Sequence, residues 1–247
     1  MKRKGFITIV VFSILAILFL TTCLRIEKGK EEGEFRKIAV EMKSILSTNE
    51  ELLQKSSSFA AYEKESVQKF SVQSNVLAMR LRRFIINYPA SAYADDAAYI
   101  LVQLAVRSPL EEKYIQKQRL FLEKYPKASL EPFTLDTLPI VCMFAKGIGV
   151  IDAVKMEISQ NLYFLKRYEE SAKETKVVID DLSVKTLSTL GYRLLGLNYI
   201  VLMKDYEAQN KNEQVRRVCN EAIEKIPNVK TKEIFIKKLK ELDSVSK

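Results

Sequence analysis

Apolar residues recur every three or four positions along most of the chain after residue 35, which is the spacing of one face of an α-helix. The run Val177-Val178-Ile179 is short and isolated, so we predict that it is helical rather than a strand. The pattern predicts an all-α fold. The segments predicted to be helical are Phe35 to Leu46, a run ending at Tyr88, Tyr93 to Val106, Ser108 to Tyr125, Val150 to Leu182 with a turn near Arg167, a run through Tyr192 and Tyr199, a run ending before Pro227, and about Lys230 to Leu242.

Proline and capping residues set the expected helix boundaries. The residue before a proline is disfavoured in a helix, so two helices should end at Pro89 and Pro126. Ser108-Pro109-Leu110-Glu111 has the residues of a capping box and predicts a helix start. Residues 127–150 are the least regular part, interrupted by Pro132, Pro139 and Gly147-Ile148-Gly149. The glycine pair lacks the strand and third glycine of a phosphate loop, so we expect a helix–helix turn or C-cap there.

Two helices should carry well-marked packing faces. In the predicted helix from Tyr93 to Val106, small alanines at 94, 97 and 98 would let a neighbouring helix approach closely. In the helix that ends at Tyr88, we expect five side chains to point into the core, namely Val76, Leu77, Leu81, Phe84 and Ile85.

A short motif occurs twice. Tyr88-Pro89-Ala90-Ser91 is echoed by Tyr125-Pro126-Lys127-Ala128-Ser129, with the two Tyr-Pro pairs offset by 37 residues. Each pair is preceded and followed by an amphipathic run. A period of this length in a helix-rich chain indicates a repeat architecture. Such arrays stack helix pairs into a solenoid and mostly serve as binding surfaces, so the motif favours binding over catalysis.

Composition narrows the possible chemistry. Hydrophobic residues make up 47% of the 247 residues, enough to bury a sizeable core, and there are only 7 Gly and 6 Pro. The chain has no His, which removes the commonest general base near neutral pH and the commonest metal ligand. Acid–base chemistry would need carboxylates, Lys or Tyr, and none is paired recognisably. We therefore expect no catalytic, cofactor-binding or metal-binding residue, and no small-molecule substrate.

The net charge is +9, and Lys2, Arg3 and Lys4 supply three of these positive charges. In the rest of the chain both signs are mixed along its length. The nearest approach to a basic block is Arg80-Leu81-Arg82-Arg83. No aromatic residues interleave with these arginines as a base-stacking platform would require. We interpret the block as the solvent-facing side of a helix and expect no nucleic-acid partner.

The N-terminus has the pattern of a targeting or anchoring segment. Lys2-Arg3-Lys4 precedes an uncharged, mostly apolar stretch from Gly5 to Leu24. Its 20 residues are also enough to span a bilayer. The leading cations predict a cytoplasmic N-terminus and an exported body. We therefore divide the chain into a signal, lipoprotein or transmembrane segment (1–24), a charged linker (25–34) and a helical-repeat domain (35–247).

The three cysteines differ in context. Leu20-Thr21-Thr22-Cys23 resembles the lipobox of bacterial lipoproteins, and the resemblance implies lipid attachment at Cys23. Thr22 stands where that family prefers Gly, Ala or Ser, so an uncleaved anchor and a simple cleaved secretory signal stay open as alternatives. Cys142 and Cys219 lie in apolar patterns, and we expect both to be buried thiols, with a disulfide between them neither required nor excluded.

A second resemblance concerns the helices. Tyr192-x-x-Leu195-Gly196-x-x-Tyr199 resembles the first-helix signature of tetratricopeptide repeats, with Tyr in place of Trp. Ala222 and Pro227 resemble the end of such a repeat, with an interval about seven residues longer than the family's. The same register places Leu101 and Pro126 in the earlier repeat, where Val102 replaces the glycine. The resemblance implies that these residues, with Tyr88, Pro89 and Tyr125, are packing positions.

The phrase Y-P-A-S-A-Y-A-D-D-A-A-Y is similar to repeats of bacterial envelope proteins, such as the lipoprotein of the outer-membrane β-barrel assembly machinery and the accessory protein of the Tol–Pal system. The similarity covers residues 80–138 well and 160–227 weakly. Asp95-Asp96 within it should cap or begin the following helix rather than bind a metal.

These resemblances imply a membrane-tethered scaffold or assembly factor of the bacterial cell envelope, with its body in the periplasm. An envelope protein would bind in the concave groove of the solenoid, through residues that the sequence does not identify. Two alternatives stay open: an inner-membrane-anchored, chaperone-like repeat protein, and a cell-wall hydrolase that uses carboxylates.

Overall fold

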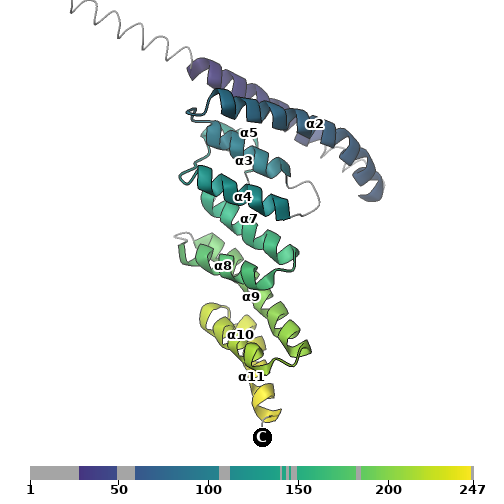
Figure 1. The fold of residues 1–247 in the computed structure, drawn as a ribbon, viewed down its shortest axis with the longest axis vertical. Coiled ribbons are helices and arrows are strands. Elements are labelled where there is room, and N and C mark those ends of the chain that lie inside the picture. Colours follow the sequence, from purple (N-terminus) through teal and green to yellow (C-terminus); the bar gives the residue numbers. More distant parts are fainter. Residues whose placement is uncertain are drawn as a thin grey trace, which may run out of the picture. The chain divides into compact units, whose positions relative to one another are not determined.

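The computed structural model describes residues 28–48, 59–105, 112–139, 141–142, 145, 149–181 and 185–245. Within these ranges the regular elements are all α-helices and no strand occurs, which confirms the all-α fold. Neighbouring helices pack in adjacent pairs (Figure 1). A helix covers residues 28–48. It is followed by α2 (Phe59–Asn87), α3 (Ala94–Ala105), α4 (Glu112–Lys124), α5 (Pro132–Thr137), α7 (Val150–Phe164), α8 (Tyr168–Asp181), α9 (Lys185–Ala208), α10 (Asn212–Lys225) and α11 (Val229–Val245).

The chain divides into two compact units. The first comprises Met1–Leu104 and Leu130–Val141, and its described helices are residues 28–48, α2, α3 and α5. The second comprises Ala105–Ser129 and Cys142–Lys247, and it holds α4 and α7 to α11.

The first described helix begins inside the segment that we expected to be a linker, because residues 28–34 are helical. A Cβ placed on Gly29 or Gly33 would meet no other atom within 4 Å, so neither glycine is required by close packing. Arg36 donates a hydrogen bond of 2.8 Å from Nε to Glu32, one helical turn earlier. Oppositely charged pairs at this spacing stabilise an exposed helix, which explains how a charged, glycine-containing segment is helical.

Aromatic packing forms the core of the first unit. Phe35 stacks on Tyr93 with ring centroids 4.7 Å apart, and it also contacts Phe84 at 5.6 Å. The expectation that five residues of α2 point inward is confirmed for Leu77, Leu81 and Phe84, which are buried, and Ile85 is half-buried. It is wrong for Val76, which is 48% exposed. The helix has apolar side chains on two faces, and the described residues pack against one of them.

The two Tyr-Pro motifs end their helices in the same way. α2 ends at Asn87 and α4 ends at Lys124, each one residue before the tyrosine. The backbone N–H of Tyr88 donates to Phe84 O at 2.8 Å, and that of Tyr125 donates to Phe121 O at 2.8 Å. In each case the tyrosine ring packs on the phenylalanine one turn earlier. The sequence echo is therefore a repeated helix-end structure.

Consecutive helices of the second unit pack against each other, from α7 to α11, and α4 packs on α7. Polar side chains join α4 to α7: buried Asn161 donates to buried Gln118 at 3.1 Å, and Gln118 donates to half-buried Glu157 at 3.0 Å. The turn expected near Arg167 is confirmed between α7 and α8, where Lys166 adopts a φ of 61°. Val177-Val178-Ile179 is helical, as expected.

The irregular segment contains one element that we did not expect. Pro132 begins the short helix α5 instead of interrupting the chain, because proline is well suited to the first turn of a helix. Gly149 has a φ of 87° and directly precedes α7, which agrees with the expected turn. The predicted capping box at 108–111 and Gly147 lie outside the described residues.

Among the described helices, none has the length and apolar character that crossing a bilayer would require. The apolar segment 5–24 and Cys23 lie outside the described residues, so the predicted anchor or signal stays a prediction.

Candidate binding hollow beside helix α9

An open hollow of about 580 Å³ lies in the second unit, between α9 and the connection from α10 to α11. Its volume falls within the range of roughly 300–1,000 Å³ that is usual for ligand sites. We call this feature the α9 hollow. Its lining residues are Thr189, Tyr192, Arg193, Gly196, Leu197 and Ile200 from α9, and Ile226, Pro227, Asn228 and Thr231 from the connection and the first turn of α11.

Helical spacing explains the α9 wall. Its six lining residues are separated by three, one, three, one and three positions, so they share one face of the helix. Tyr192 and Ile200 are half-buried, and Leu197 is 42% exposed. An apolar wall that is partly open to solvent is suited to contact with an apolar side chain of a partner.

The opposite wall is the connection from α10 to α11, whose conformation is set by Pro227 and by hydrogen bonds of Asn228. α10 ends at Lys225 and the backbone at Ile226 is extended, as expected for a residue before proline. Asn228 then caps α11, because its Oδ1 accepts hydrogen bonds from Thr231 N at 2.9 Å and Thr231 Oγ1 at 3.1 Å. The connection is therefore held in a defined shape by its own side chains.

Gly196 allows the two walls to lie close together. A Cβ at this position would be 3.3 Å from Thr231 Cγ2 and 3.6 Å from Ile226 Cδ1. The tetratricopeptide-like signature predicted a packing role for Gly196, and this close approach agrees with it. The same glycine also lines the α9 hollow.

The other signature residues face the core. Leu195 and Tyr199 are buried with Ala222, Ile226 and residues of α10. Tyr199 packs edge-to-face on Phe235 with centroids 6.5 Å apart. Its hydroxyl is buried, and burial, with the nearby Glu221 carboxylate, raises its pKa above the usual range. Leu195 and Tyr199 thus position α9, as the sequence predicted.

A polar cluster behind α9 fixes its rotation, and sequence reasoning missed it. Ser171 Oγ of α8 donates to the carbonyl of Ser159 in α7 at 2.7 Å. Asn198 Nδ2 of α9 donates to Ser171 Oγ at 2.9 Å and to Leu194 O at 3.0 Å. Asn198 is the polar residue within an otherwise apolar run, and that contrast was the available signal. The cluster ties three helices together beneath the face that lines the α9 hollow.

Arg193 places a positive charge at the edge of the α9 hollow. Its side chain is exposed, and it makes no ion pair with any residue that the structure describes. By contrast, Lys176 pairs with Glu221 and Arg167 pairs with Glu112. An apolar hollow with one uncommitted cation suits a ligand that combines an apolar group with a carboxylate.

Asp96 has a structural role beyond the one predicted for the Asp95-Asp96 pair. Both lie in the first turn of α3, as predicted. The Asp96 carboxyl, however, is fully buried and accepts hydrogen bonds from Glu131 N at 3.0 Å and Thr134 Oγ1 at 3.1 Å. It therefore satisfies donors at the start of α5. Burial raises the pKa of Asp96 to about 8.

The cysteines that the structure describes are not reactive nucleophiles. Cys142 and Cys219 are buried thiols that form no disulfide, as expected of buried thiols, and burial raises the pKa of Cys219 to about 11. A thiol with a raised pKa is a poor nucleophile. No cluster of three or more potential metal ligands occurs in the part of the chain that the structure describes.

Comparison with known proteins found no matching family and no similar curated protein or solved structure.

Proposed function

We propose that this protein is a membrane-tethered, protein-binding scaffold or assembly factor of the bacterial cell envelope. Its helix pairs would form a tetratricopeptide-like solenoid, and the α9 hollow would receive a segment of a partner protein. The observation that carries this proposal is that one helix, α9, provides both the repeat-like signature and the wall of an apolar hollow.

The chemistry of the α9 hollow supports a peptide as the occupant. Leu197 and Ile200 would contact an apolar side chain, and Arg193 would pair with a neighbouring carboxylate. Helical-repeat proteins use such faces to bind extended or helical segments of other proteins. The tether is supported by the cations at 2–4 and the apolar stretch 5–24, with Cys23 as the lipid attachment site.

Site-directed cross-linking tests the partner-binding role. A photoreactive amino acid at Thr189, an exposed position of the α9 hollow, should capture a defined envelope protein in cells that express the full chain. Leu197→Asp should abolish that capture, because it places a charge in the apolar wall. Ile234→Asp is the matched control, since Ile234 on α11 is 44% exposed against 42% for Leu197. Capture that survives Leu197→Asp would refute the proposal.

The mass of the mature N-terminus tests the tether. Lipid attachment at Cys23 predicts loss of residues 1–22 and a mass increase from acyl chains, whereas an uncleaved anchor keeps Met1 or Lys2. The uncleaved form would favour the inner-membrane-anchored, chaperone-like alternative. A soluble mature protein without either feature would contradict any tether.

A further inference from the structure

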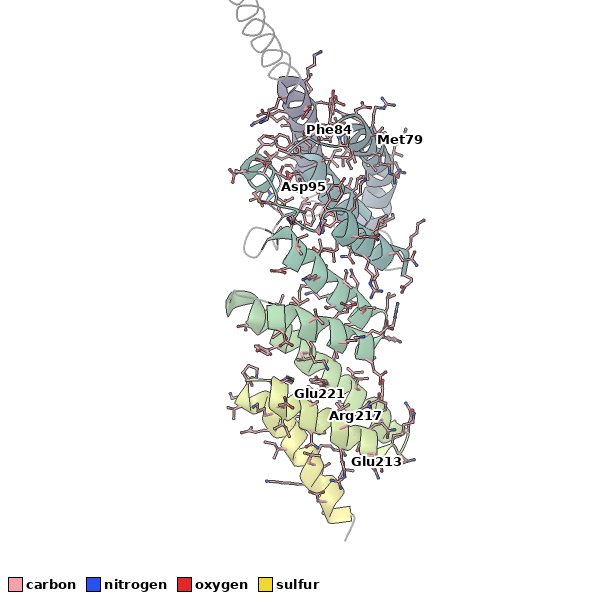
Figure 2. All side chains as sticks on the ribbon, turned by 60° about the vertical axis from the view of Figure 1, so that its left-hand side comes forward. Met79, Phe84, Asp95, Glu213, Arg217 and Glu221 are labelled. Atoms are coloured by element: carbon pink, nitrogen blue, oxygen red, sulfur yellow. The ribbon has the colours of Figure 1, made fainter. Side chains whose placement is uncertain are left out.

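Helix α2 presents a second apolar face that the described residues of the first unit leave uncovered. Val72, Val76, Met79 and Ile86 are between 48% and 76% exposed, and their spacing of four, three and seven places them on one side of the helix. They extend over about 21 Å of helix length. Met79 projects from the outside of α2, whereas Phe84 lies in the packed interior (Figure 2). We call these four residues the α2 stripe.

The part of α2 that carries the α2 stripe is positively charged, because residues 72–87 contain three arginines and no Asp or Glu. Arg83 falls within the stripe at helical spacing, and Arg80 and Arg82 flank it on either side. Arg80 pairs with Glu41 of the helix over residues 28–48. Arg82 and Arg83 are exposed and make no ion pair with the described residues. The face therefore combines apolar side chains with two uncommitted guanidinium groups.

We infer that the α2 stripe lies against a lipid bilayer that carries anionic headgroups. Apolar side chains of an amphipathic helix enter the boundary between headgroups and acyl chains, and basic side chains bind the lipid phosphates. A nucleic acid would use the arginines but would leave the apolar side chains in contact with water. The occupant that uses both halves of this face is a membrane surface.

The position of α2 next to the proposed tether favours the same occupant, and in this respect the inference rests on the proposed function. The apolar stretch ends at Leu24, and residues 28–48 are helical. That helix packs beside α2, as the contact between Phe35 and Phe84 shows. A tether at this end of the chain would therefore hold α2 within a few tens of ångströms of the bilayer, about one or two helix diameters plus the connecting residues.

Fluorescence in lipid nanodiscs tests this inference on the full chain. An environment-sensitive dye on Met79→Cys, in a Cys23→Ser background that keeps the apolar segment, should shift to the blue in discs that contain phosphatidylglycerol and be quenched by headgroup-labelled lipid. Cys142 and Cys219 are buried and should not react with the dye. The control label is Val229→Cys in the second unit, which has a similar exposure of 68% against 62% for Met79 and should show neither effect.

Matched variants separate lipid docking from general attraction. Arg82→Gln/Arg83→Gln should remove most of the shift, because each arginine near an anionic surface strengthens binding about fivefold. Lys237→Gln/Lys240→Gln, which removes the same charge from exposed positions of α11, should leave it unchanged. Val72→Ser/Ile86→Ser should also reduce the shift. Discs of phosphatidylcholine alone should give a weaker shift than discs with phosphatidylglycerol.

The failures are distinguishable. If the chain does not co-elute with the discs, the tether is wrong and the inference is wrong with it. If it co-elutes but Met79→Cys shows no shift, or if Val229→Cys shifts equally, only the α2 inference is overturned. Binding of an oligonucleotide that depends on Arg82 and Arg83, without any lipid shift, would overturn it in favour of a nucleic-acid contact.

Discussion

Each unit has a buried polar side chain that joins neighbouring helices by hydrogen bonds. In the first unit this is the carboxyl of Asp96, and in the second it is the amide of Asn198. Asp96 joins α3 to the start of α5 by accepting hydrogen bonds from Glu131 N and Thr134 Oγ1. Asn198 joins α9 to α8 by donating to Ser171 Oγ. Both side chains are fully buried. Each cluster orients helices that apolar packing alone would leave free to rotate.

The difference lies in ionisation. A carboxyl is a strong acceptor for the donors at a helix start, but burial makes its charged form costly. A neutral cluster avoids that cost, although it leaves Asn198 Oδ1 buried without a hydrogen bond. The first unit should therefore respond to pH, and the junction in the second unit should not. This contrast can be tested by removing each group in turn.

The largest effect is expected from Asp96→Ala. The substitution removes the Asp96 oxygens that accept from the Glu131 N–H and the Thr134 hydroxyl, and it opens a cavity. The first unit should therefore lose about 3–4 kcal/mol of stability. Hydrogen exchange read by mass spectrometry should speed up in α3 and α5, roughly a hundredfold or more. Exchange in α8 and α9 is the internal control, and faster exchange there instead would contradict the assignment of Asp96 to the first unit's junction.

Asn198→Ala should have a smaller effect, about 2 kcal/mol, on the second unit. The loss is smaller because the substitution also removes a carbonyl oxygen that already lacks a partner. Faster exchange is expected in α8 and α9, with α3 and α5 unchanged. A loss equal to that of Asp96→Ala would mean that the orphaned oxygen costs nothing, and the comparison between the two junctions would fail.

Stability should depend on pH through Asp96. Burial is the main cause that raises its pKa from 3.8 to about 8; the Glu131 N–H opposes the shift, and the Asp95 and Glu131 charges add to it. The folded state thus keeps a proton that the unfolded chain releases. The stability this proton provides is complete below pH 3.8 and is lost as the pH rises towards 8.

Asp96→Asn isolates this effect, because an amide resembles the protonated carboxyl and does not titrate. Relative to the unsubstituted chain, the variant should gain up to about 2 kcal/mol between pH 6 and pH 8, at about 1.4 kcal/mol per pH unit. Exchange of α3 and α5 at several pH values measures the difference. The corresponding difference for Asn198→Ala should stay flat, and a flat profile for Asp96→Asn would show that the carboxyl is ionised in the folded protein.

The sequence predicts a feature well when the residues that cause it are close together in the chain, and poorly when they are far apart. The helix ends at Tyr88 and Tyr125 were predicted because the signal, a following proline, is adjacent. The bond from Glu131 to Asp96 joins residues 35 apart, and no local pattern encodes it. Val76 was placed inward because helical spacing identifies an apolar face without saying whether it is covered.

The sequence indicated one wall of the α9 hollow, the wall formed by α9, but not the other. Gly196 stood out as part of a repeat-like signature on one helix. Asn228 and Thr231 line the opposite side of the hollow from Gly196. They do so because α10 ends before Pro227 and the chain then turns so that α11 begins beside α9. The sequence therefore indicates one wall, and the fold is needed to supply the other.

The smallest effect is expected from Gly191→Ala. This substitution tests whether close packing of α9 against α8, rather than hydrogen bonding, sets the position of α9. A Cβ on Gly191 would lie 2.8 Å from Ile179 Cγ1 of α8, and no sequence pattern predicted a role for this glycine. Gly191→Ala should cost about 1 kcal/mol, because overpacking of roughly 1–3 kcal/mol is partly offset by alanine's higher helix propensity.

The matched control is Gly33→Ala, whose Cβ would meet no atom within 4 Å and which should stabilise its helix slightly. Exchange in α8 and α9 again supplies the measurement. If Gly191→Ala destabilised these helices more than Asn198→Ala does, steric fit at the crossing would outweigh the amide. The two units would then differ in the tightness of helix packing more than in the charge of their buried polar groups.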